Sequence, residues 1–141
     1  MTPKEQAEAL LDELIPFAEE MLNKHGEFFP FAGLMTPEGD FAHVAGYDEE
    51  EQPPTTRVRE LIERGLRAQA TRNECDLVVI VVNVTLKDQE TGEQVDAIQA
   101  AIEHRAGYFV DVFFPYSIVG QEVQYGETRA QLREPTVFGT K

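Results

Sequence analysis

The chain has few of the residues that carry disulfide and metal chemistry. Its 141 residues include three histidines, no tryptophan and a single cysteine, Cys75. One cysteine cannot form an internal disulfide, and the histidines lack the close spacing of a zinc motif. Glu74 and Asp76 flank Cys75, and their negative charges would raise the pKa of its thiol and disfavour a reactive thiolate. The sequence therefore predicts no metal site, no cofactor and no cysteine nucleophile.

Long apolar segments are absent as well. No run approaches the roughly 20 residues of a membrane-spanning helix, and the longest, residues 77–82, has the length of a strand. The first residues are polar and an amphipathic segment follows, so we expect no secretory signal peptide. With one cysteine, these features predict a cytoplasmic protein. The motifs of serine hydrolases and phosphate-binding loops are also missing, and we expect a protein that is not an enzyme.

Positive charge is scarce. Twelve Lys and Arg stand against 26 Asp and Glu, which gives a formal net charge of −14. Such a chain should repel nucleic acid and anionic membranes and attract a basic protein partner. The alternative is that the acids serve solubility alone. Five arginines gather between residues 57 and 72, either as partners of nearby acids or as an anion site.

Length and composition predict one domain over residues 1–141, and the order of its predicted helices and strands makes it an α+β domain. Hydrophobic residues make up 42% and charged residues 27%, which are ordinary globular values. An apolar stripe predicts a helix over 3–24 with Thr2 as its N-cap, an interruption at Pro16 and a stop at Gly26. A second helix should begin at Thr55 or Thr56 and end near Arg72.

The remaining segments favour strands. Residues 28–35 and 41–47 predict a hairpin, 76–87 a central strand buried on both faces, and 108–118 another strand. Residues 95–105 fit either a short helix or a strand, and we favour the strand because it completes a meander. Residues 48–54 form an acidic loop, and 129–141 a C-terminal extension docked through Val137 and Phe138. We expect an antiparallel sheet of about five strands with two helices packed on one face.

A short aromatic phrase occurs twice, as Phe-Phe-Pro-Phe at 28–31 and Phe-Phe-Pro-Tyr at 113–116. Proline has no N–H for a ladder, so each phrase should mark an edge, a bulge or a strand end. The two sites are expected to be neighbours in one sheet. Their aromatics either fill the core or form a patch for dimerisation or partner binding. Phe28, Phe29, Phe31 and Tyr116 are thus candidate binding residues.

Glu103, His104 and Arg105 form the densest polar group, close to Tyr108 at a predicted turn. With Tyr116 they suggest an alternative function, a pocket of a small enzyme or small-molecule binder. The other interpretation is a strand end whose charged residues face water.

The segments 27–32, 96–98, 103–107 and 114–116 together resemble small bacterial proteins of unknown function. These are single α+β domains, some encoded near polymorphic toxins, and the resemblance carries no catalytic residue. It implies a non-enzymatic protein of the immunity type. We therefore expect an acidic protein-binding module that is a homodimer and takes a basic partner.

Overall fold

The protein folds as an α+β domain in which an antiparallel sheet lies between two helices. The structure, a computed structural model, describes residues 1–45, 55–88 and 90–138, so the expected acidic loop 48–54 lies outside the described residues. Along the chain the elements are α1 (Pro3–His25), β1 (Phe31–Met35), β2 (Phe41–Ala45), α2 (Thr55–Thr71), β3 (Leu77–Lys87), β4 (Gln94–His104), β5 (Tyr108–Val119), β6 (Glu122–Tyr125) and β7 (Arg129–Leu132).

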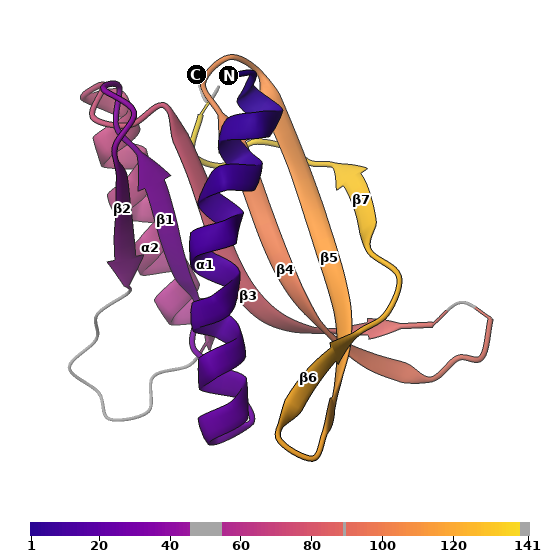
Figure 1. Ribbon diagram of the computed structural model, residues 1–141. Coiled ribbons are helices and arrows are strands. Elements are labelled where there is room, and N and C mark those ends of the chain that lie inside the picture. The colour runs from indigo at the N-terminus through magenta and orange to yellow at the C-terminus, as the bar shows by residue number, and fades with distance from the viewer. Residues whose placement is uncertain (46–54, 89, 139–141) are drawn as a thin grey trace.

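The strands run in the order β2-β1-β3-β4-β5-β6, and β7 also pairs with β5 (Figure 1). Every ladder is antiparallel. The coarse fold class is confirmed, and the sheet has seven strands among the described residues instead of about five. The difference comes from β6, where the sequence allows a short strand over 121–125, and from β7, which the weak periodicity of residues 129–141 concealed.

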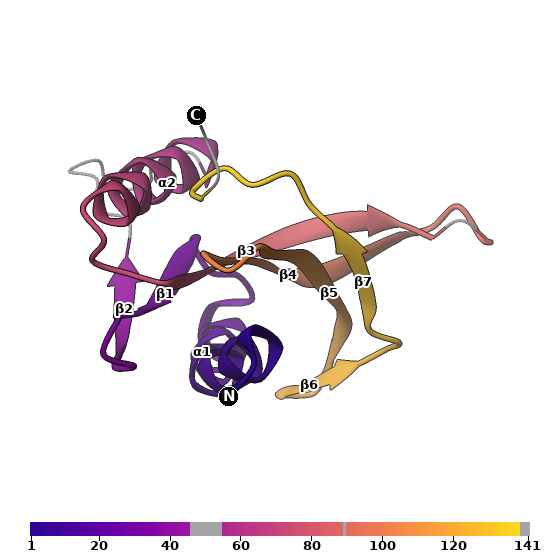
Figure 2. The same ribbon diagram turned by 90° about the horizontal axis from the view of Figure 1, so that it is seen from above.

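The two helices cover opposite faces of the sheet (Figure 2). Side chains of β3 alternate between the faces, so Leu77, Val79 and Val81 pack with α1. Their neighbours Val78, Ile80 and Val82 pack with α2. The expectation that both helices share one face is therefore wrong. A strand buried on both faces needs a cover on each, because its successive side chains point in opposite directions.

Local sequence explains where α1 begins and ends. Thr2 and Glu5 form a reciprocal capping box at its start, and Gly26 ends it with a φ of +74°. The helix passes through Pro16 without a break. Pro16 removes one helical hydrogen bond, that of the Asp12 carbonyl, and both residues are exposed, so water can replace the lost donor.

Residues 97–104 of β4 pair with residues 108–115 of β5, and the strand interpretation of 95–105 is confirmed. Pro115 lies where the ladder between β4 and β5 ends, at the pair Ala97–Pro115. The ladder with β6 begins at the next residue, Tyr116. The sequence predicts an edge, a bulge or a strand end here, and Pro115 instead lies inside β5, which continues to Val119, at the point where its partner strands change. In the first phrase, Pro30 directly precedes β1.

The C-terminal extension docks on the face that carries α2. Val137 and Phe138 are buried with Val58, Ile62 and Leu66 of α2, as the sequence predicted. In Figure 2 the chain runs from β7 across the sheet to the side of α2. The tail therefore extends the cover that α2 alone provides.

Gly33 of β1 is the point of closest approach between the sheet and α1. A Cβ there would stand 2.9 Å from both Cδ atoms of Leu14 and 3.0 Å from Leu10 Cδ1. Both leucines are buried. We expect Gly33→Ala to lower the free energy of unfolding by about 1–3 kcal/mol, because the leucines must leave their packed positions.

Gly65→Ala in α2 is the matched control. A Cβ at this position would have no atom within 4 Å, so alanine should stabilise the helix by about 0.5–1 kcal/mol. Urea unfolding of both variants measures the difference. Equal effects of the two substitutions would contradict the close packing at Gly33.

Candidate functional site

The aromatic phrases contribute mainly to the core on the α1 face. Phe28, Phe31 and Tyr116 are buried there together, whereas Phe29 is 49% exposed. The strands that carry the phrases are not adjacent, since β3 and β4 lie between β1 and β5. The two phrases are thus neighbours only through the shared core. Of these four predicted binding residues, Phe29 alone presents an exposed ring.

The predicted polar group is divided between the two faces of the sheet. Glu103 and His104 are consecutive in β4, and their side chains point in opposite directions. Tyr116 lies eight residues beyond Tyr108 along β5, a distance of about 26 Å at roughly 3.3 Å per residue. Tyr108 is the residue paired with His104. Glu103, His104 and Tyr116 are therefore not brought into one pocket.

Glu103 holds the C-terminal tail. Its carboxylate is 1% exposed and accepts hydrogen bonds from three successive backbone N–H groups, those of Thr136 (2.9 Å), Val137 (2.8 Å) and Phe138 (3.0 Å). Arg133 Nη2 lies 3.2 Å from the same carboxylate. This arrangement satisfies a buried charge with backbone donors and one cation.

Arg133 extends this network to a second buried acid. Its Nη1 lies 2.7 Å from Asp111 Oδ1, which also accepts a hydrogen bond of 3.1 Å from Gln99 Nε2. Within the described chain the buried Arg133 Nε has no hydrogen-bond partner. The network joins β4, β5 and the C-terminal tail in the interior of the protein. Its ion pairs and hydrogen bonds hold the tail against the sheet.

His104 is fixed as a neutral ring on the α1 face. Its Nδ1 accepts the backbone N–H of Ala106 at 3.0 Å, so its Nε2 carries the proton and donates to Gln6 Oε1 at 2.7 Å. Burial lowers the pKa of His104, and the nearby charge of Asp76 opposes this shift. The ring thus ties the first turns of α1 to the end of β4.

Arg105 closes the C-terminal end of α2. It donates to the carbonyls of Ala70 (2.8 Å) and Cys75 (3.0 Å), and its guanidinium lies 5.0 Å from the centre of the Phe138 ring. Burial raises the pKa of the Cys75 thiol, with Arg105 opposing the shift. Arg105 therefore contacts both the end of α2 and the Phe138 ring, and Cys75 is buried in the same core cluster as Phe138.

The described chain offers neither a metal cluster nor a membrane span. Within residues 1–45, 55–88 and 90–138, no group of three or more His, Cys, Asp or Glu is placed to hold a metal ion. No helix of the described part is long and apolar enough to cross a membrane.

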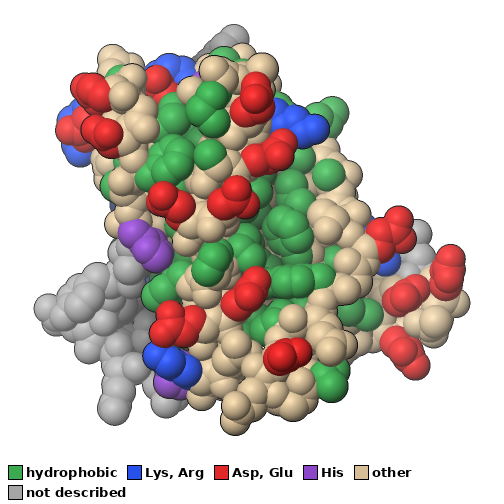
Figure 3. All heavy atoms as spheres, in the orientation of Figure 1, with side chains coloured by type: hydrophobic (Ala, Val, Ile, Leu, Met, Phe, Trp, Pro, Cys, Tyr) green, Lys and Arg blue, Asp and Glu red, His purple; other side chains and the backbone are tan. Residues whose placement is uncertain are grey.

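A groove of about 680 Å³ runs between α1 and the last strands. We call it the α1 groove. Figure 3 shows apolar side chains gathered along it, with acidic side chains beside them on α1. Its lining comes from α1 (Lys4, Ala7, Glu8, Leu11, Asp12, Ile15), from β4 and β5 (Ile102, Tyr108, Val110, Val112, Phe114), and from Tyr125, Thr128 and Ala130. Tyr108 is the one predicted binding residue that lines it.

The α1 groove has an apolar floor, and the charged residues of its lining are two acids, Glu8 and Asp12, and one base, Lys4. Glu8 and Asp12 are one helical turn apart and both exposed. At one end, Tyr125 Oη donates to Glu19 Oε1 at 2.8 Å and so joins β6 to α1. Burial and the Glu19 carboxylate raise the pKa of Tyr125, which keeps the phenol protonated as a donor. The arrangement suits an apolar ligand that carries positive charge.

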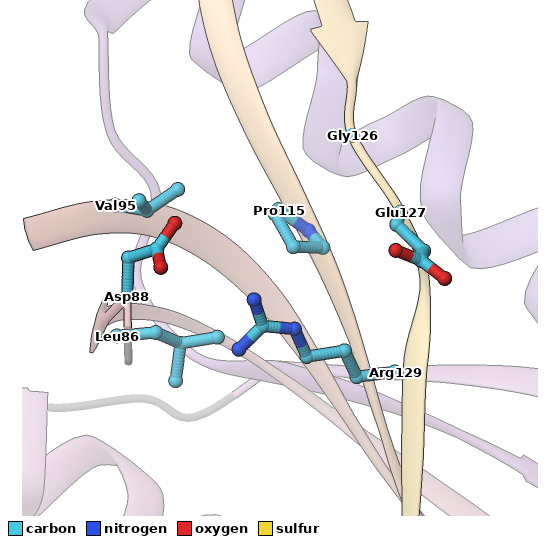
Figure 4. A pocket seen from close by; sticks show the side chains of 7 residues that line it. All are labelled: Leu86, Asp88, Val95, Pro115, Gly126, Glu127 and Arg129. Carbon is cyan, nitrogen blue, oxygen red and sulfur yellow. The ribbon is translucent and has the colours of Figure 1, made fainter. Parts of the chain in front are cut away.

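A smaller pocket of about 190 Å³ lies on the other face, at the base of the β3–β4 hairpin. Leu86, Val95 and Pro115 give it apolar walls. In Figure 4 the Arg129 side chain extends toward Leu86 and Asp88. A volume of this size admits only a small chemical group, so this pocket is a weaker candidate for the functional site than the α1 groove.

Comparisons with known proteins add no assignment. No protein-family model, no curated protein and no solved structure matches the chain. The α1 groove and its charge are therefore the basis for a functional proposal.

Sequence reasoning did not identify the α1 groove. Its rim acids Glu8 and Asp12 looked like any solvated helix face, and Val110 and Val112 looked like ordinary core positions of a strand. One signal was present: in β5 the alternate residues Tyr108, Val110, Val112 and Phe114 are all apolar or aromatic, and the structure leaves each of them only partly buried. The groove arises because α1 covers these residues only in part.

Glu103→Gln tests whether the Glu103 carboxylate holds the C-terminal tail against the sheet. The amide can accept with one oxygen only and presents an N–H₂ group to backbone donors, so we expect the free energy of unfolding to fall by about 3 kcal/mol. Amide hydrogen exchange at residues 136–138 should accelerate. Glu134→Gln, at an exposed position in the same segment, is the control. If both variants change the free energy of unfolding in urea by the same small amount, Glu103 does not hold the tail.

His104 should make stability depend on pH. Its folded pKa is lowered by burial, so the unfolded chain binds the proton more readily. The stability that the neutral ring contributes is fully present above its ordinary pKa of 6.5 and is lost as the pH falls below that value. We expect His104→Gln to show a smaller decrease in unfolding free energy between pH 7.5 and 5 than the parent chain. His25→Gln, on the surface, should retain the parent's decrease, and identical pH profiles of the parent and His104→Gln would contradict the assignment.

Proposed function

We propose that the protein is a non-enzymatic binding module whose α1 groove takes a basic, amphipathic segment of a protein partner. One observation carries the proposal: an apolar groove with acids on its rim occurs in a chain with a formal net charge of −14. Apolar contact with the floor would supply affinity, and the acids would select a cationic partner and accelerate its association.

The size of the α1 groove supports a segment of a protein as its occupant. The volume of about 680 Å³ lies within the range of about 300–1,000 Å³ typical of ligand sites. Along α1 the lining extends from Lys4 to Ile15, which is about 16 Å at 1.5 Å per residue. That length corresponds to about five residues of an extended chain.

The placement of the polar residues supports binding over catalysis. Glu103 and Arg105 hold the tail, and His104 holds α1. A side chain whose hydrogen bonds are used within the fold is poorly placed to transfer protons to a substrate. The residues that face the α1 groove offer shape and charge instead.

Synthetic peptides test the proposal. The probes are a ten-residue peptide of alternating lysine and valine, an eleven-residue lysine–leucine peptide with helical periodicity, and versions of both with glutamate in place of lysine. We expect the protein to bind at least one basic peptide, with an affinity that falls as salt rises, and to bind neither acidic peptide. Isothermal titration calorimetry measures the affinities.

Charge reversal on α1 locates the interaction. Glu8→Lys combined with Asp12→Lys should weaken binding of the basic peptide about tenfold or more, because the rim then repels it. The control carries Glu13→Lys and Glu20→Lys, which make the same change of net charge at exposed positions of α1 outside the groove lining. Equal losses in the two double variants, or binding of the acidic peptides, would overturn the proposal.

A further inference from the structure

The floor of the α1 groove is a face of the sheet that α1 covers only in part. Two rows of paired side chains cross this face from β4 through β5 to β7, namely Ile102–Val110–Leu132 and Ala100–Val112–Ala130. Exposure rises along the first row from 2% at Ile102 to 87% at Leu132, and the second row ends in an exposed alanine. In Figure 2, β7 and much of β5 lie to the right of α1, beyond its width. We call Val110, Val112, Ala130 and Leu132 the open strip.

The backbone of β5 beneath the open strip is already hydrogen-bonded on both sides. β5 pairs with β4 along residues 108–115 and with β7 along residues 110–113. A segment that lies on this face can form no ladder with it, so its own N–H and C=O groups must find partners elsewhere. An α-helix pairs these groups within itself, and a single extended strand does not. The open strip therefore favours a helix.

The spacing of the strands suits a helix beside α1. Because α1 packs on residues of β1, β3 and β4, it lies over β3, the middle strand of the three. Packed helices lie about 8–10 Å apart, and two strand spacings amount to about 10 Å. A helix next to α1 would thus lie over β5, two strands from β3, and its width of about 10 Å would reach Leu132 on β7. The lining of the groove from Lys4 to Ile15 corresponds to about eleven residues of such a helix, or three turns.

The charges beside the open strip indicate which helix fits. Lys4, Glu8 and Asp12 line the groove at four-residue spacing, so this flank of α1 carries two acids and one base. Arg129 and Arg133 alternate with the open-strip residues of β7 and point to the opposite face of the sheet. A basic helix on the groove face would meet the acids of α1 and would not meet these arginines.

Neither described helix of a second copy is free to take this place. The apolar face of α1 packs in one core cluster and that of α2 in the other. Two copies would also each bring a formal net charge of −14 to the contact, which opposes association. The occupant is therefore a helix of a different protein.

We propose that the partner of the α1 groove binds as an amphipathic helix of about three turns that lies beside α1 on the open strip. Its apolar face packs on Val110, Val112 and Leu132, and its basic flank faces Glu8 and Asp12. This inference rests on the proposed function of the α1 groove and adds the conformation and the position of the bound segment.

Two isomeric peptides test the conformation of the bound segment. One is the helical lysine–leucine peptide, and the other contains the same residues in alternating order. Because the two carry the same charge and the same apolar content, only the periodicity of their side chains differs. We expect the helical order to bind about tenfold more tightly or better in calorimetry, at concentrations where sedimentation shows both peptides to be monomeric.

A tryptophan placed at each position of the lysine–leucine peptide in turn reports the bound conformation. The protein contains no tryptophan, so the indole emission belongs to the peptide alone, and burial shifts it to shorter wavelength. In a bound helix the positions that shift recur every three to four residues. In a bound strand every second position shifts.

Leu132→Ala tests the position of the helix on the protein. Leu132 is exposed, so its truncation leaves the core unchanged, and a helix that covers it should bind about tenfold more weakly. Val119→Ala is the matched control, because Val119 is an exposed apolar residue outside the groove lining. This variant should bind within about threefold of the parent. Equal affinities of the parent and Leu132→Ala would overturn the placement of a helix over the open strip.

The outcomes separate the two proposals. Failure of every basic peptide to bind overturns the proposed function and the bound helix together. If an alternating peptide binds as tightly as the helical one, or if every second tryptophan position shifts, the bound helix is overturned and the α1 groove remains a binding site. A helical period in the tryptophan series, together with weaker binding by Leu132→Ala, supports a helix beside α1.

Discussion

The arrangement of the whole domain depends on the burial of β3 on both faces. Each of the six side chains from Leu77 to Val82 is almost fully buried, and burial of one such side chain contributes about 1.5–3 kcal/mol. Three of them point to each face. Because a domain is stable by only about 5–15 kcal/mol in total, neither face can stay uncovered. One helix on each side of the sheet is the consequence, with α1 and α2 as the two covers.

The cover on the α2 face is completed by the tail and not by a third helix. Among the described residues of the tail, Val137 and Phe138 are the buried apolar side chains. Apolar contact therefore holds the tail at these two residues. The buried carboxylate of Glu103 supplies the rest, because it accepts the N–H groups of three consecutive residues that no strand would satisfy. A charge in this position needs a partner, and Arg133 of the tail provides it.

The sequence predicted the parts of the fold that follow from local pattern. The run at 77–82, the alternation at 95–105 and the capping signals of α1 all act over a few residues, and each matches the structure. The placement of both helices on one face failed, although the same run at 77–82 already required a cover on each side. Glu103 could not be assigned in advance, because its partners lie more than 30 residues away in a segment with no periodicity. The α1 groove was equally hidden, since it depends on how far α1 reaches across β5.

Pro115 lies where β5 changes its partner strand from β7 to β6. By the alternation of the β5 ladder, its missing N–H points to the side of β5 that carries β7 and β6, between the pairs Phe113–Arg129 and Tyr116–Tyr125. At this gap β5 exchanges one partner strand for the other without leaving a donor unpaired. The chain between the two partner strands keeps one bond to β5, since the Gly126 N–H donates to the Pro115 carbonyl at 2.8 Å. Thr128 then lines the α1 groove, and Tyr125 bonds Glu19 on α1. The second aromatic–proline phrase thus places its proline at this change of partner strands, while Phe114 lines the α1 groove and Tyr116 is buried in the core.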